Sequence, residues 1–172
     1  MIHILPSGCE YINIPKCGSQ SVREALGIKD GDKILKGGRK RVGGAVKVPF
    51  DGTKYVAIVR DPLDRFVSGV HWLNKNYEVD YCYGTWMGMY GNYPRKRMQN
   101  HLRPQIDFIQ DPSKFHKLYW LHEIDQFFVD HGLGPVRHEN KSTDKKMPVT
   151  KDVIDWVRST FKEDYAMLKK FK

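Results

Sequence analysis

Two short segments, about forty residues apart, constrain the fold of this chain more than any other feature. Each reads as a β-strand that runs into a turn and then into a helix, and each carries a cation at its turn. The first spans residues 11–21 and the second spans residues 55–68. Backbone N–H groups at the start of a helix favour an anion. The pair therefore predicts two phosphate-binding turns in one small protein.

The first turn follows a run of β-forming residues that Pro15 ends. Lys16 stands at the mouth of the turn, and an apolar helical pattern begins at Val22. The alternative interpretation is an ordinary strand-to-helix turn with a surface lysine. The segment is not a Walker A loop, because that motif places its lysine after the glycine-rich stretch, whereas Lys16 precedes Gly18.

The second turn has a sharper pattern. Arg60 ends an apolar strand, Asp61 is a good N-cap residue, and Pro62 suits the first position of a helix. Ser68 lies about two helical turns further on. It can join Arg60 on one anion, because arginine offers a planar fork of donors. In the alternative interpretation Arg60 pairs with a carboxylate and Ser68 is a small packing residue.

Together the two turns resemble the motifs of sulfotransferases that use 3′-phosphoadenosine 5′-phosphosulfate (PAPS), in particular the carbohydrate sulfotransferases (sulfotransferase family 2 type). Residues 14–21 match a loop that reads IPKxGxxS, and residues 59–68 match a motif that reads VRDPxxRxxS. The resemblance implies that the first loop binds the 5′-phosphosulfate and that the second motif binds the 3′-phosphate. It assigns the first role to Lys16, Cys17, Gly18, Ser19, Gln20 and Ser21, and the second to Arg60 and Ser68. Gln20 departs from the family, where threonine is common.

Further segments are similar to parts of the same family, in the same order along the chain. Residues 101–105 resemble a central HxxPQ-type stretch, and residues 118–123 resemble a later strand. Residues 138–142 resemble an HxNxS segment. That resemblance implies cofactor contacts for Asn140 and Ser142, near the 3′-phosphate or the adenine. The alternative is a polar loop before the last helices.

One α/β domain over residues 1–172 is expected, with a mostly parallel central sheet, flanking helices and a P-loop-like nucleotide-binding architecture. The length fits a single domain with a sizeable core. Residues 149–171 predict the closing helices, with Thr150 as a cap and an apolar stripe that starts at Val153 and Val157.

The expected activity is transfer of a sulfuryl group from PAPS to an acceptor hydroxyl on a carbohydrate, with release of adenosine 3′,5′-bisphosphate. Lys16 would stabilise the charge that develops on the bridging oxygen. A base must take the acceptor proton, and a neutral imidazole suits that step. His101 is the first candidate and His71 the second, with a desolvated carboxylate as the alternative. Gln105 and Arg103 are the candidate acceptor-binding residues.

The net charge of +9 fits an anionic ligand, and it fits nucleic acid equally well. The sequence contains no recognisable DNA- or RNA-binding motif, which disfavours a non-catalytic nucleic-acid-binding protein. A P-loop-type kinase that uses ATP and magnesium is the other rival, and it would need a Walker A loop. Three cysteines without paired spacing favour a reducing compartment. No metal-ligand motif is present, so no metal is expected.

Residues 1–6 are too short for the apolar core of a signal peptide, and no apolar run approaches membrane-spanning length. A cytoplasmic protein without a membrane span is therefore expected, and the oligomeric state stays open. The basic, glycine-rich residues 36–46 read either as a clamp for an acidic group or as a solvated loop. Residues 77–98 combine aromatics with cations, which suits sugar binding or a loop pinned to the core.

Overall fold

The chain divides into two compact units, each described here by itself. The computed structural model describes residues 2–28, 41–42, 45–46, 54–90, 99–136 and 147–171. The sheet unit comprises Met1–Arg60 and Ile106–Lys141, and the helical unit comprises Asp61–Gln105 and Ser142–Lys172.

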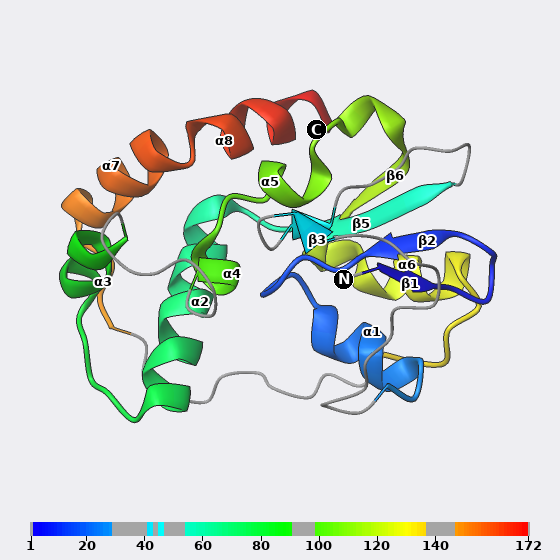
Figure 1. Ribbon diagram of the computed structural model, residues 1–172, viewed down its shortest axis with the longest axis horizontal. Coiled ribbons are helices and arrows are strands. Elements are labelled where there is room, and N and C mark those ends of the chain that lie inside the picture. The colour runs from blue at the N-terminus through cyan, green and yellow to red at the C-terminus, as the bar shows by residue number, and fades with distance from the viewer. Residues whose placement is uncertain are drawn as a thin grey trace. The chain divides into compact units, whose positions relative to one another are not determined.

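The sheet unit is built on a four-stranded sheet in the order β1-β2-β5-β6 (Figure 1). Its strands are β1 (Ile2–Ile4), β2 (Glu10–Ile12), β5 (Tyr55–Val59) and β6 (Phe115–Trp120). β1 pairs antiparallel with β2, whereas β5 pairs parallel with both β2 and β6. The predicted α/β class with a mostly parallel sheet is thus confirmed. The carboxyl ends of β2, β5 and β6 lie at one edge of the sheet, which we call the carboxyl edge.

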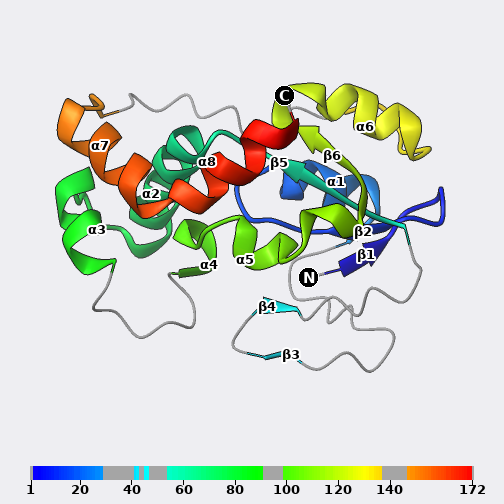
Figure 2. The same ribbon diagram turned by 90° about the horizontal axis from the view of Figure 1, so that it is seen from above.

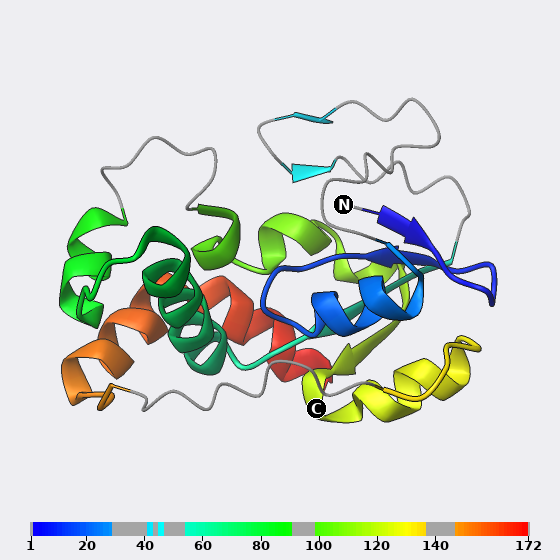
Figure 3. The ribbon, with the colours of Figure 1, turned by 90° about the horizontal axis from the view of Figure 1, so that it is seen from below.

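Burial explains why these residues form the sheet. Every residue of β5 is buried, as expected for an apolar run that is covered on both faces. Helices α1 (Ser19–Ala25) and α6 (Ile124–Asp130) lie on one side of the sheet (Figures 1 and 3). The ring of Phe127 on α6 packs against Tyr11 of β2 and Tyr119 of β6, with centroids 5.4 and 5.1 Å away.

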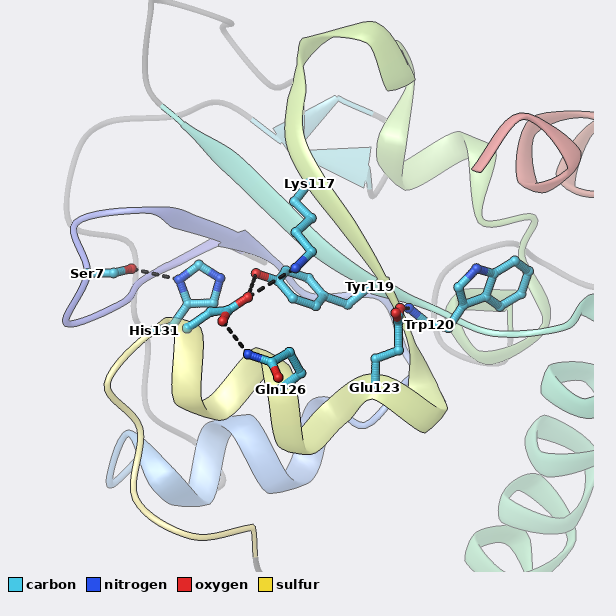
Figure 4. Close-up of polar contacts among 8 residues, drawn as sticks. Ser7, Lys117, Tyr119, Trp120, Glu123, Gln126 and His131 are labelled. Atoms are coloured by element: carbon cyan, nitrogen blue, oxygen red, sulfur yellow. Dashed lines mark hydrogen bonds and ion pairs between the residues drawn. The ribbon is translucent and has the colours of Figure 1, made fainter. Parts of the chain in front are cut away.

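A polar cluster joins α6 to the sheet and to the β1–β2 turn (Figure 4). Three side chains donate to the carboxylate of Asp130: Tyr119 at 2.7 Å, Gln126 at 2.6 Å and Lys117 at 3.1 Å. The hydrogen bonds from Tyr119, Gln126 and Lys117 hold the pKa of Asp130 well below its usual range. Beside it, Oγ of Ser7 lies 2.7 Å from Nδ1 of His131. His131 is buried, and so is His3 on β1.

The helical unit has α2 at its centre, in contact with α3, α4 and α7 (Figure 2). Its elements are α2 (Pro62–Tyr77), α3 (Tyr83–Met89), α4 (Gln99–Leu102), α7 (Lys151–Thr160), α8 (Lys162–Leu168) and the 3₁₀ turn η3 (Lys169–Phe171). Phe66 and Val70 of α2 pack with Val157 and Phe161 in one apolar cluster. The predicted stripe is therefore core, although it is divided between two helices, because α7 ends at Thr160 and α8 begins at Lys162.

The start of α2 follows the sequence prediction. The Asp61 carboxylate accepts the backbone N–H groups of Leu63 at 2.9 Å and Asp64 at 3.2 Å. Pro62 occupies the first helical position, where a missing N–H costs nothing. Thr150 is likewise the N-cap residue of α7, without a side-chain cap bond.

Five shorter elements complete the description: β3 (Arg41–Val42), β4 (Ala45–Val46), α5 (Ile106–Ile109) and the 3₁₀ turns η1 (Pro112–Lys114) and η2 (Leu121–Glu123). β3 and β4 form a two-stranded antiparallel sheet within the predicted basic loop. The rest of that loop, as well as Asn140 and Ser142, lies outside the described residues. No helix in the described ranges is long and apolar enough to cross a bilayer.

Candidate functional site

The first predicted turn lies at the carboxyl edge, where β2 ends and the chain enters α1 (Figure 1). Lys16 has a φ of 67° and Gly18 a φ of 72°, so two nearby residues adopt the left-handed conformation. Glycine adopts it freely, whereas a lysine there is strained. Strained residues concentrate at functional sites, because only a structure that needs them holds them in place. One of the strained positions thus falls in the loop that the sequence motif predicts, while Glu78 and Gln110 have a positive φ as well.

A side chain at position 18 would have to displace the ends of two neighbouring side chains. A Cβ atom at this position would lie 2.8 Å from Cδ1 of Ile124 and 3.0 Å from Cδ1 of Leu121. Both neighbours belong to the segment that follows β6, so the turn after β2 is packed against the turn after β6. Gly18 is also the N-cap residue of α1, and it has no side chain that could accept from the first helical turn. That arrangement is compatible with a loop that binds an anion through backbone N–H groups.

Arg60 joins the second predicted turn to the first. It follows β5 directly and is half-buried, and its Nη1 donates to the carbonyl oxygen of Lys16 at 3.4 Å. The turns after β2 and β5, which the sequence analysis singled out separately, therefore meet within the sheet unit. A guanidinium at this position adds a full positive charge to the edge where parallel sheets bind their ligands.

The other residues of the first loop differ in exposure. Cys17 is fully buried, and its N–H donates to the carbonyl of Ile14 at 3.3 Å. Its thiol is therefore covered by protein in this structure. Ser19 and Ser21 are half-buried, whereas Gln20 is exposed.

The second predicted motif continues into the helical unit. Ser68 is half-buried on α2, and His71 follows it one turn later. Nε2 of His71 lies 3.2 Å from the hydroxyl of Tyr83, whose pKa is raised by burial. His71 is thus tied to α3, the helix that carries Tyr83.

His101 lies on α4, stacked on the indole of Trp72. Their ring centroids are 3.7 Å apart and the ring planes are inclined by 19°. The side chain is half-buried. The candidate base therefore lies face to face with an aromatic ring of α2.

The remaining residues of the HxxPQ-type stretch leave the helix, since α4 ends at Leu102. Arg103 is half-buried, and its carbonyl accepts from Nη1 of Arg65 at 2.5 Å. Gln105 is fully buried, and its N–H donates to Oδ2 of Asp164 on α8 at 2.8 Å. The backbone of this stretch is thus held from both sides within the helical unit.

One residue at the carboxyl edge was passed over by the sequence analysis. His122 lies on η2, directly after β6, and is exposed. Its ring is nearly parallel to that of Trp120, at a centroid distance of 6.2 Å. Its position at the end of a strand could have indicated a functional role. It was not chosen as a candidate because residues 118–123 resemble a structural strand.

Comparison with protein-family models, with curated proteins and with solved structures finds no match to this chain. The described part of the chain contains no group of three or more histidine, cysteine, aspartate or glutamate residues that could hold a metal ion. The function must therefore be inferred from the two motifs and from the way the sheet unit brings their turns together.

Proposed function

We propose that the chain is a sulfotransferase that transfers a sulfuryl group from PAPS to a hydroxyl group of a carbohydrate. The main support is the hydrogen bond from Arg60 to the carbonyl of Lys16, because it joins the two turns whose sequences resemble the cofactor motifs. These turns lie at the carboxyl edge, where open parallel sheets bind nucleotides. A P-loop-like mode of nucleotide binding is part of this proposal.

The loop from Lys16 to Ser21 is suited to the reacting end of the cofactor. Backbone N–H groups that follow a left-handed glycine can surround phosphate oxygens, and the hydroxyls of Ser19 and Ser21 add donors. PAPS supplies an activated sulfuryl group, whose bond to the bridging oxygen breaks as the acceptor oxygen bonds to sulfur. The Lys16 ammonium then stabilises the negative charge that the bridging oxygen acquires, and a base takes the acceptor proton.

Arg60 is suited to a phosphate group that does not react. Its guanidinium offers several donors in one plane, and one of them already holds the carbonyl of Lys16. Binding at such a group contributes equally to the ground state and the transition state. We therefore assign the 3′-phosphate to Arg60 and the chemical step to Lys16.

The direct test is incubation of the purified chain with PAPS labelled in its sulfuryl group and a panel of carbohydrate acceptors, with a metal chelator present. The proposal requires that label appears in an acceptor in equal amount to the adenosine 3′,5′-bisphosphate formed. Absence of transfer to every acceptor, together with absence of adenosine 3′,5′-bisphosphate binding, would reject it.

Ligand binding separates this proposal from its rivals. Adenosine 3′,5′-bisphosphate should stabilise the fold against thermal unfolding, by about 2.7 kcal/mol at a hundredfold excess over Kd, and more than ATP with magnesium does. Arg60→Ala should weaken its Kd by roughly tenfold to a hundredfold, as expected for lost charge-assisted hydrogen bonds. Thermal unfolding with each nucleotide measures the first effect, and calorimetric titration measures the second.

Arg158→Ala is the matched control for Arg60→Ala, because it removes the same charge from an exposed position on α7. Its affinity should stay within about twofold of the wild type, as for a screened surface charge. An unchanged affinity in Arg60→Ala would show that the second motif is assigned wrongly. Equal stabilisation by both nucleotides would favour a kinase.

A further inference from the structure

One face of α2 is turned toward the segment that carries His101. Arg65, Gly69 and Trp72 are spaced by four and three residues, so they follow one another along a single face of the helix. Each of the three contacts the segment of residues 100–103, and each does so through a different kind of interaction. These contacts are part of the packing of α2 on α4.

Arg65 fixes the backbone on both sides of His101. It is only 2% exposed, and its guanidinium donates to the carbonyl of Arg103 at 2.5 Å and to that of Asn100 at 3.4 Å. A buried arginine must satisfy its donors, and here it does so on carbonyls before and after the same histidine. The two bonds restrict the path of the chain through His101.

Gly69 allows the two helices to approach each other. A Cβ atom at this position would lie 2.8 Å from the carbonyl oxygen of His101 and 2.7 Å from Cδ2 of Leu102. The first neighbour is a backbone atom, which cannot turn away as a flexible side chain would. Any larger residue at position 69 would therefore push the backbone of His101 away from α2.

Trp72 sets the plane of the imidazole. The ring centroids of Trp72 and His101 are 3.7 Å apart, with the planes inclined by 19°. Such a stack restricts rotation of the imidazole about its side-chain bonds. The negative face of an indole also attracts a cation, which is what an imidazole becomes after it has taken a proton.

We propose that Arg65, Gly69 and Trp72 form a clamp on α2 that fixes the position and the ring plane of His101, and that Trp72 is a positioning residue for proton transfer to that imidazole. The role in proton transfer rests on the proposed function, whereas the placement of the ring does not. A merely structural stack would contribute to stability and leave turnover unchanged.

The placement is tested by NMR, because stacking over an indole shifts the ring protons of the histidine upfield. The imidazole signals of His101 are assigned by comparison with His101→Gln. Trp72→Leu should abolish the upfield shift, and Trp72→Phe should retain part of it. The matched control is Trp156→Leu, which removes an indole of the same unit that packs on Phe66 and Phe161; it should keep the shift.

The role in proton transfer is tested by kinetics with labelled PAPS. Trp72→Leu should lower kcat by roughly tenfold to a hundredfold, the effect expected of a misplaced reacting group, with KM for PAPS within about twofold. Trp72→Phe should recover most of the loss, and Trp156→Leu should show none of it.

Two results would overturn the inference. Unshifted His101 signals in the wild type would refute the clamp, and a Trp72→Leu protein with wild-type kcat would refute the role of Trp72 in proton transfer. Failure of the proposed function would give a different result from failure of the clamp. A wild-type protein that transfers no sulfate but keeps the upfield shift would overturn the sulfotransferase assignment and the role in proton transfer, and would leave the ring placement established.

Discussion

Lys16→Ala is expected to lower kcat by about a hundredfold or more, while the Kd for adenosine 3′,5′-bisphosphate changes by only a few-fold. The lysine charge matters most when the bridging oxygen becomes negative, so its loss raises the barrier more than it weakens binding. Steady-state kinetics with labelled PAPS, combined with calorimetric titration of the product, measures both quantities.

Because Lys16 has a left-handed backbone, the alanine variant alone does not separate the effect of the charge from that of backbone strain. Two further variants make that separation. With a φ of 67°, alanine would lose the charge and keep the backbone strain. Lys16→Gly loses the charge and relieves the strain, and Lys16→Asn introduces a residue that tolerates this conformation. All three should be equally slow, although the glycine and asparagine variants should unfold at higher temperature than the alanine variant. A glycine variant with wild-type kcat would show that the charge is not used.

His101→Ala should lower kcat by on the order of a hundredfold or more, with the affinity for adenosine 3′,5′-bisphosphate preserved. The loss follows because an acceptor hydroxyl transfers its proton poorly to water at neutral pH. Rates across a pH series, for the wild type and for the variant, give the measurement. His101→Gln is the stricter variant, since its planar amide can still lie on Trp72 but cannot accept the proton at useful strength.

His116→Ala is the control, because His116 is exposed on β6 and has no assigned role. Near wild-type transfer by His101→Ala would show that the base lies elsewhere. His71 is then the next residue to test, followed by His122, which the structure places after β6 at the carboxyl edge.

The sequence predicted well those parts of the fold that are determined by residues adjacent to one another in the chain. The strand at Tyr55–Val59 is a continuous apolar run, and Asp61 and Pro62 carry the start signals of a helix in adjacent residues. Both the strand and the helix start were found where they were expected. The closing helices followed in the same way from the spacing of apolar residues such as Val153 and Val157.

Features that depend on distant contacts were not predictable in this way. The left-handed turn at Lys16 is held by Arg60, and Gly18 is confined by Leu121 and Ile124, which lie about a hundred residues further along the chain. The stack of His101 on Trp72 likewise joins two segments that no common motif links. No linker-like composition marks the boundary between the two compact units near Arg60.

The buried histidines of the sheet unit couple its stability to the proton concentration. Burial lowers the pKa of His131, and burial together with the positive N-terminus and Arg23 lowers that of His3 to about 4. The unfolded chain binds protons at both imidazoles near pH 6.5, whereas the folded chain does not. The free energy of unfolding should therefore fall as the pH is lowered from about 6.5 toward 4.

Urea titrations over this range would measure the effect. A combined His3→Gln and His131→Gln variant should show a flatter dependence, whereas His122→Gln, at an exposed position, should match the wild type; identical slopes in all three proteins would exclude these two imidazoles as the cause. Acidification would then loosen the sheet that carries the Lys16 loop, so that a loss of activity in acid would combine unfolding of this sheet with protonation of the base, and only the urea titrations would separate the two.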